Sequence, residues 1–214
     1  MLFNLLTGML IGFFIAVPIG PIDMLCIRRT LLWGTRSGFI TGLGAAFADA
    51  IYGASAAFGI ITLTTFLIGY KQLFQLIGGI FLCCLGMKTF RTSNSEDTRG
   101  LSTGSLAFAF VTTFFLALMS PMTILSLVGA FSVLGVTIEG SSFDTALLLT
   151  LGVFAGSTLW WFILSSGVSL FRDKLNVRNL IWINRFSGVI LISFGLTAIG
   201  MALLHFEDNS GIFT

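Results

Sequence analysis

The chain has 214 residues, of which 56% are hydrophobic and only 9% are charged, whereas an average soluble domain has about 25% charged residues. The net charge of +2 is not concentrated in any basic run, so nothing in the sequence indicates a nucleic-acid partner. Long uncharged stretches separate the charges, and helices satisfy their own backbone hydrogen bonds in lipid. We therefore predict an all-α, polytopic membrane protein that forms a single transmembrane domain over residues 1–214.

Six stretches are long and apolar enough to cross a bilayer, since a spanning helix needs about 20 residues. They lie at roughly 4–27, 38–67, 71–90, 104–136, 145–170 and 181–205. The first stretch lacks the basic segment that opens a secretory signal, so we interpret it as a retained helix. The sequence thus predicts six transmembrane helices.

The basic residues are concentrated in every second loop between these stretches. The odd-numbered loops hold ten of the eleven Lys and Arg residues, namely Arg28, Arg29, Arg36, Lys88, Arg91, Arg99, Arg172, Lys174, Arg178 and Arg185. The second loop holds only Lys71. Because cytoplasmic loops carry the excess of Lys and Arg, we expect the odd-numbered loops to be cytoplasmic and both termini to lie outside.

The two halves of the chain, about 1–95 and 104–205, resemble each other in three places. The aligned pairs are GPIDML at 20–25 with SPMTIL at 120–125, GAAFADAIY at 44–52 with GVFAGSTLW at 152–160, and GGIFLCCLG at 78–86 with SGVILISFG at 187–195. Three spans per half is an odd number, so the repeat must be inverted. Inverted three-plus-three repeats recur in secondary transporters, whose substrate site lies near the midplane. Chance similarity between Leu- and Gly-rich helices is the alternative.

Prolines occur at matched positions in the two halves. Pro18 and Pro21 interrupt the first helix and Pro121 interrupts the fourth, and each removes a backbone donor. The preceding residues, Gly20 and Ser120, are able to adopt the non-helical geometry that a break requires. We therefore predict that the first and fourth helices are broken at proline, with freed carbonyls facing a binding site. A simple packing kink is the alternative.

Two acids lie inside the predicted spans. Asp49 is well inside the second span, where an Asp costs about 3 kcal/mol on insertion scales, so a functional role is the default interpretation. Tyr52 follows it by nearly one turn. Asp23 follows Pro21 at the first break, where capping of the second half-helix would explain it without any further role. A structural, hydrogen-bonded Asp49 remains the corresponding alternative.

The repeat alignment extends this candidate site into the second half. It matches Ser157 with Asp49 and Trp160 with Tyr52, so Ser157 is expected to offer a hydroxyl across the site from the acid. Arg28 and Arg29 are expected to be cytoplasmic anchors, with a reach back to Asp23 or to a substrate carboxylate as the less favoured interpretation.

The sequence lacks the patterns of several other chemistries. No His, Cys and Asp cluster has metal-ligand spacing, and no Gly-rich phosphate loop is present, so we expect no metal, no cofactor and no ATP hydrolysis. The three cysteines are expected to be small apolar side chains.

Residues 17–59, VPIGPIDMLCIRRTLLWGTRSGFITGLGAAFADAIYGASAAFG, closely resemble the signature region of the bacterial L-lysine exporter (LysE-type) family. The matching residues are Pro18, Gly20, Pro21, Asp23, Gly38, Gly42, Asp49 and, in the second half, Ser120-Pro121-Met122. The resemblance implies efflux of amino acids or similar small metabolites, driven by the proton-motive force across a bacterial inner membrane. Ser120 and Met122 stand where the family typically has Asn and Lys, which leaves the substrate open.

We therefore predict a secondary exporter of amino acids or similar small amine-bearing metabolites, and not an enzyme. Its expected partners are a small-molecule substrate, protons and the lipid bilayer, with a homo-oligomer left open. The substrate or proton site is expected at Asp49, Asp23, Pro18, Gly20, Pro21, Tyr52, Ser120, Pro121, Ser157 and Trp160. A cation exporter of related architecture would want more inward carboxylates or thiolates, and a membrane redox or enzymatic protein would want a catalytic constellation.

Overall fold

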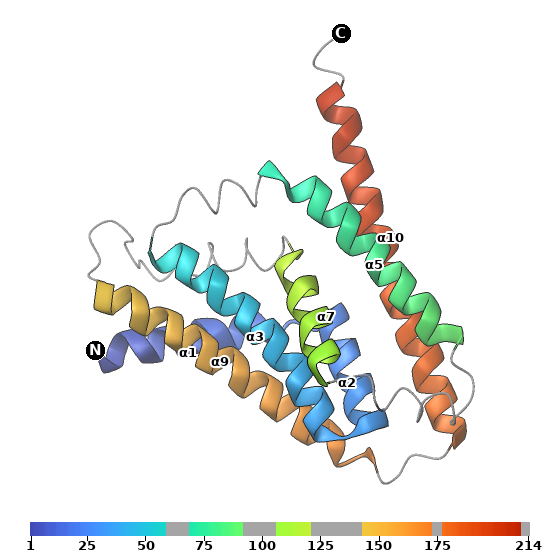
Figure 1. The fold of residues 1–214 in the computed structure, drawn as a ribbon, viewed down its shortest axis with the longest axis horizontal. Coiled ribbons are helices and arrows are strands. Elements are labelled where there is room, and N and C mark those ends of the chain that lie inside the picture. Colours follow the sequence, from blue (N-terminus) through green and yellow to red (C-terminus); the bar gives the residue numbers. More distant parts are fainter. Residues whose placement is uncertain (59–68, 92–105, 121–142, 173–176, 211–214) are drawn as a thin grey trace.

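The computed structural model describes residues 1–58, 69–91, 106–120, 143–172 and 177–210. Seven helices and no strand are present within these ranges (Figure 1). The helices are α1 (Leu2–Ala16), α2 (Pro21–Trp33), α3 (Thr35–Ala57), α5 (Lys71–Arg91), α7 (Leu106–Leu118), α9 (Phe143–Ser169) and α10 (Val177–Ser210). The predicted all-α class is confirmed for the described part of the chain.

Four of these helices are long and apolar enough to cross a membrane. The spanning segments are Thr35–Ala57, Gln72–Arg91, Phe143–Ser169 and Ile181–Leu204. The bent pair α1 and α2 makes a fifth candidate span, and α7 is a shorter apolar helix. These helices support a polytopic membrane protein. The ends of the predicted second and fourth spans, and Pro121 with them, lie outside the described residues.

The chain bends by 83° between α1 and α2, at the Pro-Ile-Gly-Pro segment. Pro21 occupies the first turn of α2, where its missing N–H costs no intrahelical hydrogen bond. Gly20 before it is extended, with φ −134° and ψ −170°. The Asp23 carboxylate accepts a hydrogen bond from the Gly20 N–H at 2.8 Å. The local sequence therefore ends one helix and starts another in a new direction.

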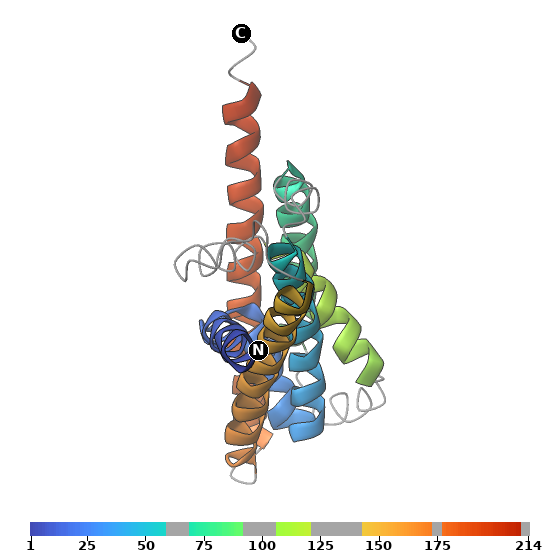
Figure 2. The same ribbon diagram turned by 90° about the vertical axis from the view of Figure 1, so that its left-hand side faces the viewer.

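Helix α3 lies in the middle of the main bundle, where it packs against α2, α7 and α9, and α1 packs along α9 (Figures 1 and 2). Glycines allow the close approach of α1 and α9. A Cβ atom on Gly152 would lie 2.8 Å from the Cα of Gly8, and one on Gly12 would lie 2.7 Å from the Cα of Val153. Small residues at such crossings let backbones touch, which is how helices associate in lipid.

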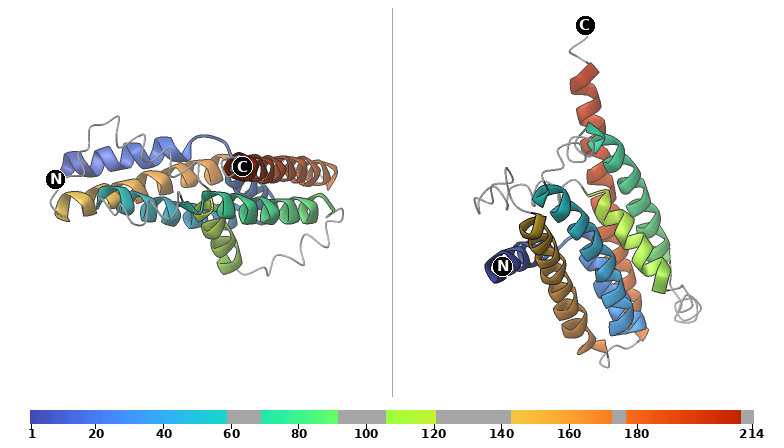
Figure 3. Two further views of the ribbon diagram at one scale, coloured as in Figure 1. Left: turned by 90° about the horizontal axis from the view of Figure 1, so that it is seen from above. Right: turned by 60° about the vertical axis from the view of Figure 1, so that its left-hand side comes forward.

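Helices α5 and α10 form a pair that lies beside the main bundle (Figures 1 and 3). Their glycines meet reciprocally. A Cβ atom on Gly79 would lie 2.8 Å from the Gly195 carbonyl oxygen, and one on Gly86 would lie 2.9 Å from that of Gly188. This order makes the two helices antiparallel. The pair contacts the rest of the described chain where α10 packs against α2, and where Leu82 of α5 lies in a buried cluster with Leu25 of α2 and Leu116 of α7.

Candidate functional site

The two interior acids are both buried within the bundle. Asp49 on α3 is 5% exposed, and one of its carboxylate oxygens accepts a hydrogen bond from the Ser157 hydroxyl on α9 at 2.6 Å. Ser157 is fully buried. The structure therefore brings together, across the α3–α9 contact, the two residues that the repeat alignment matched with each other.

Asp23 lies at the break between α1 and α2 and is 4% exposed. Its Oδ2 atom caps Gly20, but its Oδ1 atom has no hydrogen-bond partner among the described residues. The indole of Trp160, on α9, lies close to this carboxyl, and its buried Nε1 is also without a partner in the described part of the chain. The indole N–H and the carboxyl thus lie beside each other at the break, without a hydrogen bond of normal geometry between them.

The carboxyls of Asp23 and Asp49 are close enough to interact electrostatically. No Lys or Arg side chain among the described residues forms a salt bridge with either of them. A buried carboxylate is normally paired or neutralised, because an isolated buried charge costs several kcal/mol. Each of these carboxyls is therefore suited to hold a proton or to bind a ligand cation.

Tyr52 connects α3, the helix that carries Asp49, to α7. It is buried, and its hydroxyl donates a hydrogen bond to the Leu118 carbonyl at the C-terminal end of α7. Ser120 follows two residues later and is half-buried. On the α1 side, the ring of Phe13 meets Trp160 edge-to-face, with 5.7 Å between centroids. Elements from both halves of the chain therefore border the two acids.

The remaining predicted site residues shape the break. Gly20 and Pro21 are half-buried there, whereas Pro18 is exposed. Pro18 therefore contributes backbone geometry to the break, and its ring does not line the buried acids. Pro121, the predicted counterpart in the second half, lies outside the described residues.

Arg28 and Arg29 do not lie in an exposed loop, as the expectation that they are loop anchors required, but within α2. They are only 7% and 5% exposed, and both are held by neutral partners. The Arg28 Nε donates a hydrogen bond to the Asn184 side-chain oxygen on α10 at 2.8 Å. Arg29 Nη1 donates to the Thr41 hydroxyl on α3 and to the Ala109 carbonyl on α7.

Two further threonines complete the surroundings of Arg29, and sequence reasoning missed them. Its guanidinium also donates to the hydroxyls of Thr112 and Thr113 on α7, at 3.0 and 3.2 Å. Arg29 thereby connects α2 to α3 and α7. The signal in the sequence was the pair of hydroxyl residues within an otherwise apolar helix, LAFAFVTTFFLAL.

Metal binding was not expected from the sequence. Within the described residues, no group of three or more His, Cys, Asp and Glu side chains is arranged to hold a metal ion. The site offers carboxylates, a hydroxyl, an indole N–H and backbone groups at a helix break.

Two known proteins are similar to this chain in sequence over two thirds or more of its length. A protein from Bacillus subtilis (strain 168), named "Putative amino acid efflux protein YcgF", is 27% identical over 193 residues, or 89% of this chain and 92% of that protein. The "Uncharacterized membrane protein YahN" of Escherichia coli (strain K12) is 29% identical over 150 residues, or 67% of this chain and 65% of that protein. No solved structure matches the chain.

The family model described as LysE type translocator matches residues 13–201, nearly the whole chain. This match includes the helix break, both buried acids and the α9 residues that contact them. The resemblance expected from residues 17–59 is confirmed. The chain belongs to the LysE type translocator family, and it is a membrane transporter rather than an enzyme.

Proposed function

We propose that this protein exports amino acids or similar small amine-bearing metabolites across a bacterial inner membrane, driven by the proton-motive force. The name of the Bacillus subtilis relative, which covers most of this chain, supports amino-acid efflux. The observation that carries the proposal is the pair of buried carboxyls, Asp23 and Asp49, that have no basic partner among the described residues.

The chemistry of an ammonium group matches the groups beside the helix break. An ammonium has three N–H donors and no acceptor. The free Oδ1 of Asp23 and the carboxylate of Asp49 are acceptors, and the Trp160 indole adds a cation-binding aromatic face. A proton that replaces the ammonium would neutralise the same carboxyl. Substrate and proton would therefore compete for one site.

The driving force is sufficient for useful export. One elementary charge moved through 100 mV releases about 2.3 kcal/mol, which sustains a concentration gradient of roughly 50-fold. Exchange of one proton for one zwitterionic amino acid, whose ammonium binds at Asp49, would move one net positive charge inward and so couple export to the membrane potential. No phosphate-binding loop is needed for this mechanism.

We further propose that the two halves form an inverted repeat that alternates between inward- and outward-open packing. Three features of the packing support it. The first helix of each half packs on the second helix of the other, as α1 on α9 and α7 on α3. The aligned residues Asp49 and Ser157 hydrogen-bond with each other. In the third pair of aligned segments, Gly79 matches Gly188 and Gly86 matches Gly195. Gly79 contacts Gly195, and Gly188 contacts Gly86, which is the exchange that a two-fold relation requires.

The proposed orientation has both termini outside, and thiol labelling in intact cells tests it. In a chain whose three cysteines are replaced by Ser, a single cysteine at Ser141, before α9, should react with an impermeant maleimide. One at Asn176, after α9, or at Thr98 should react only after the cells are permeabilised. The reverse pattern would contradict the orientation, and labelling at all three positions would contradict the inversion of the repeat.

The transport function itself is tested by efflux of a panel of radiolabelled amino acids. Cells are loaded with each compound, and efflux is compared between cells that carry the chain and cells that lack it. At least one amine-bearing compound should leave several-fold faster with the chain, and a protonophore should remove the difference. If no member of the panel is exported by cells with confirmed expression, the amino-acid proposal fails.

A further inference from the structure

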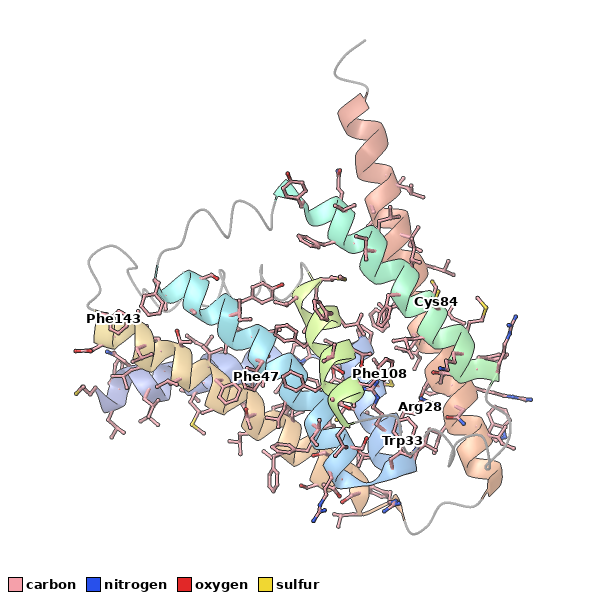
Figure 4. The ribbon with its side chains drawn as sticks, in the orientation of Figure 1. Arg28, Trp33, Phe47, Cys84, Phe108 and Phe143 are labelled. Atoms are coloured by element: carbon pink, nitrogen blue, oxygen red, sulfur yellow. The ribbon has the colours of Figure 1, made fainter. Side chains whose placement is uncertain are left out.

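Arg28 is a buried cation at the contact between α2 and α10 that the proposed transport mechanism does not use. Its Nε donates to Asn184, and its guanidinium carbon lies 5.9 Å from the centroid of the Trp33 ring (Figure 4). Its side chain is 7% exposed. The side chain therefore lies buried between α2 and α10, in the C-terminal half of α2.

No carboxylate in the described part of the chain compensates the positive charge of Arg28. Among the described residues, neither Arg28 nor Arg29 forms a salt bridge with a carboxylate, and the two guanidiniums are neighbours in the sequence. Burial of an unpaired charge costs several kcal/mol unless a counter-ion is supplied. An anion from outside the chain would remove this cost.

Arg29 does not provide the place for that anion, because its partners are all oriented as acceptors. The hydroxyls of Thr41, Thr112 and Thr113 donate their protons to backbone carbonyls one turn earlier in their own helices. Only their lone pairs are left for Arg29, and the Ala109 carbonyl is also an acceptor. An incoming anion would be repelled by the lone pairs of these four oxygen atoms.

Arg28 is different, because the structure gives it only the Nε hydrogen bond among the described residues. Its two terminal nitrogens therefore keep four N–H donors in a planar fork, the geometry that binds phosphate or carboxylate oxygens in a bidentate manner. Because 7% of the side chain is exposed, it reaches the surface of the described bundle. The fork therefore has the donors that an oxyanion requires.

The position of Arg28 separates this site from the acids. Five residues along an α-helix correspond to a rotation of roughly 140°, so Arg28 faces away from Asp23 around α2. Exposed arginines are found near the same end of the described bundle, at Arg36, Arg172 and Arg185. Trp33 is an aromatic residue of the kind that lies at headgroup level.

We infer that the Arg28 guanidinium, with Asn184 and Trp33 beside it, binds the phosphate of an anionic phospholipid headgroup between α2 and α10. Basic pockets between transmembrane helices on the cytoplasmic side are suited to such headgroups. Because α10 joins the main bundle through α2, the bound lipid would also hold the α5–α10 pair against the bundle. The inference does not depend on which substrate is transported.

The test measures lipid binding to the purified, full-length protein in a neutral detergent. Phosphatidylglycerol, phosphatidylcholine and inorganic phosphate are added separately, and bound lipid is counted by native mass spectrometry. We expect phosphatidylglycerol to bind best. Replacement of Arg28 by Gln should weaken it about tenfold, since a charge-assisted bidentate contact is lost. Arg28→Lys, which keeps the charge but not the fork, should bind with intermediate affinity.

Arg36→Gln is the matched control, because it removes the same charge from an exposed position near the same end of the bundle. It should bind phosphatidylglycerol as the wild type does. Equal binding by wild type and Arg28→Gln would overturn the inference, as would an equal loss in Arg36→Gln. Equal occupancy by inorganic phosphate, or displacement of lipid by an exported amino acid, would assign the site to a free anion instead. If Arg28→Gln does not fold, the inference is still tested by Arg28→Lys and by the binding of phosphatidylglycerol, phosphatidylcholine and inorganic phosphate to the wild type.

Discussion

Asp49→Asn is expected to abolish net efflux while the protein stays in the membrane at near wild-type abundance. The amide has nearly the same volume, and its oxygen is able to accept the hydrogen bond that the Ser157 hydroxyl now donates to the carboxylate. The local packing of α3 on α9 should therefore survive. What is lost is the negative charge and the exchangeable proton, on which the proposed coupling of substrate and proton depends.

The measurement is efflux of the compound identified in the amino-acid panel, followed at external pH 6, 7 and 8 together with an immunoblot of the membrane fraction. Asp144→Asn is the control, because Asp144 is an exposed acid in the first turn of α9 and its removal deletes the same charge. It should export normally. Asp49→Glu keeps a titratable carboxyl at a displaced position, so it should retain some activity with a shifted pH dependence.

Normal export by Asp49→Asn across this pH range would make Asp49 a structural hydrogen-bonding residue. The coupling group would then have to be sought at Asp23, whose Oδ1 has no partner among the described residues. A loss of both activity and abundance would instead mean that the carboxylate contributes to folding.

Gly156→Leu should cause the largest loss of stability among single substitutions on α9. A Cβ atom on Gly156 would lie 2.8 Å from the Phe13 nitrogen of α1, which is closer than real Cβ atoms approach backbone. Rigid backbone cannot yield as a flexible side chain does, so α1 must move away from α9. Overpacking of this kind costs about 3 kcal/mol, which corresponds to a fall of roughly 6–12 °C in melting temperature.

Gly167→Leu is the matched comparison on the same helix, because a Cβ atom there would meet nothing within 4 Å. Both substitutions replace Gly by a good helix former, so the gain in helix propensity is the same and cancels in the comparison. The melting temperature of each purified variant in detergent is the readout. Equal melting temperatures would mean that α1 does not pack on α9 at this glycine.

The class of the protein and the place where the first two helices meet at an angle both follow from local sequence. Apolar stretches without charges require helices in lipid, and this holds whatever their neighbours are. The segment from Pro18 to Pro21 ends one helix and begins the next because proline lacks the N–H donor. Asp49 was recognised as an interior acid for the same local reason: its charge is isolated within an apolar segment.

The repeat alignment predicted a relation between distant residues that local sequence does not contain. It matched Ser157 with Asp49 across 108 residues, and the structure joins these two side chains by a hydrogen bond. The proposed inverted repeat would bring equivalent helices together about its axis, and it would thereby explain the contact between these aligned residues. The position of the Trp160 indole beside the Asp23 carboxyl did not follow from the alignment.

The tertiary structure alone decided the environment of the two arginines. In the sequence Arg28 and Arg29 follow an apolar stretch and resemble the anchors of a cytoplasmic loop, but α2 continues through them to Trp33 and buries both. Their hydrogen-bond acceptors come from positions up to 156 residues away, on α3, α7 and α10. Whether a charged side chain is solvated or buried depends on which helices pack around it, and packing between distant helices is not encoded in the pattern of any one of them.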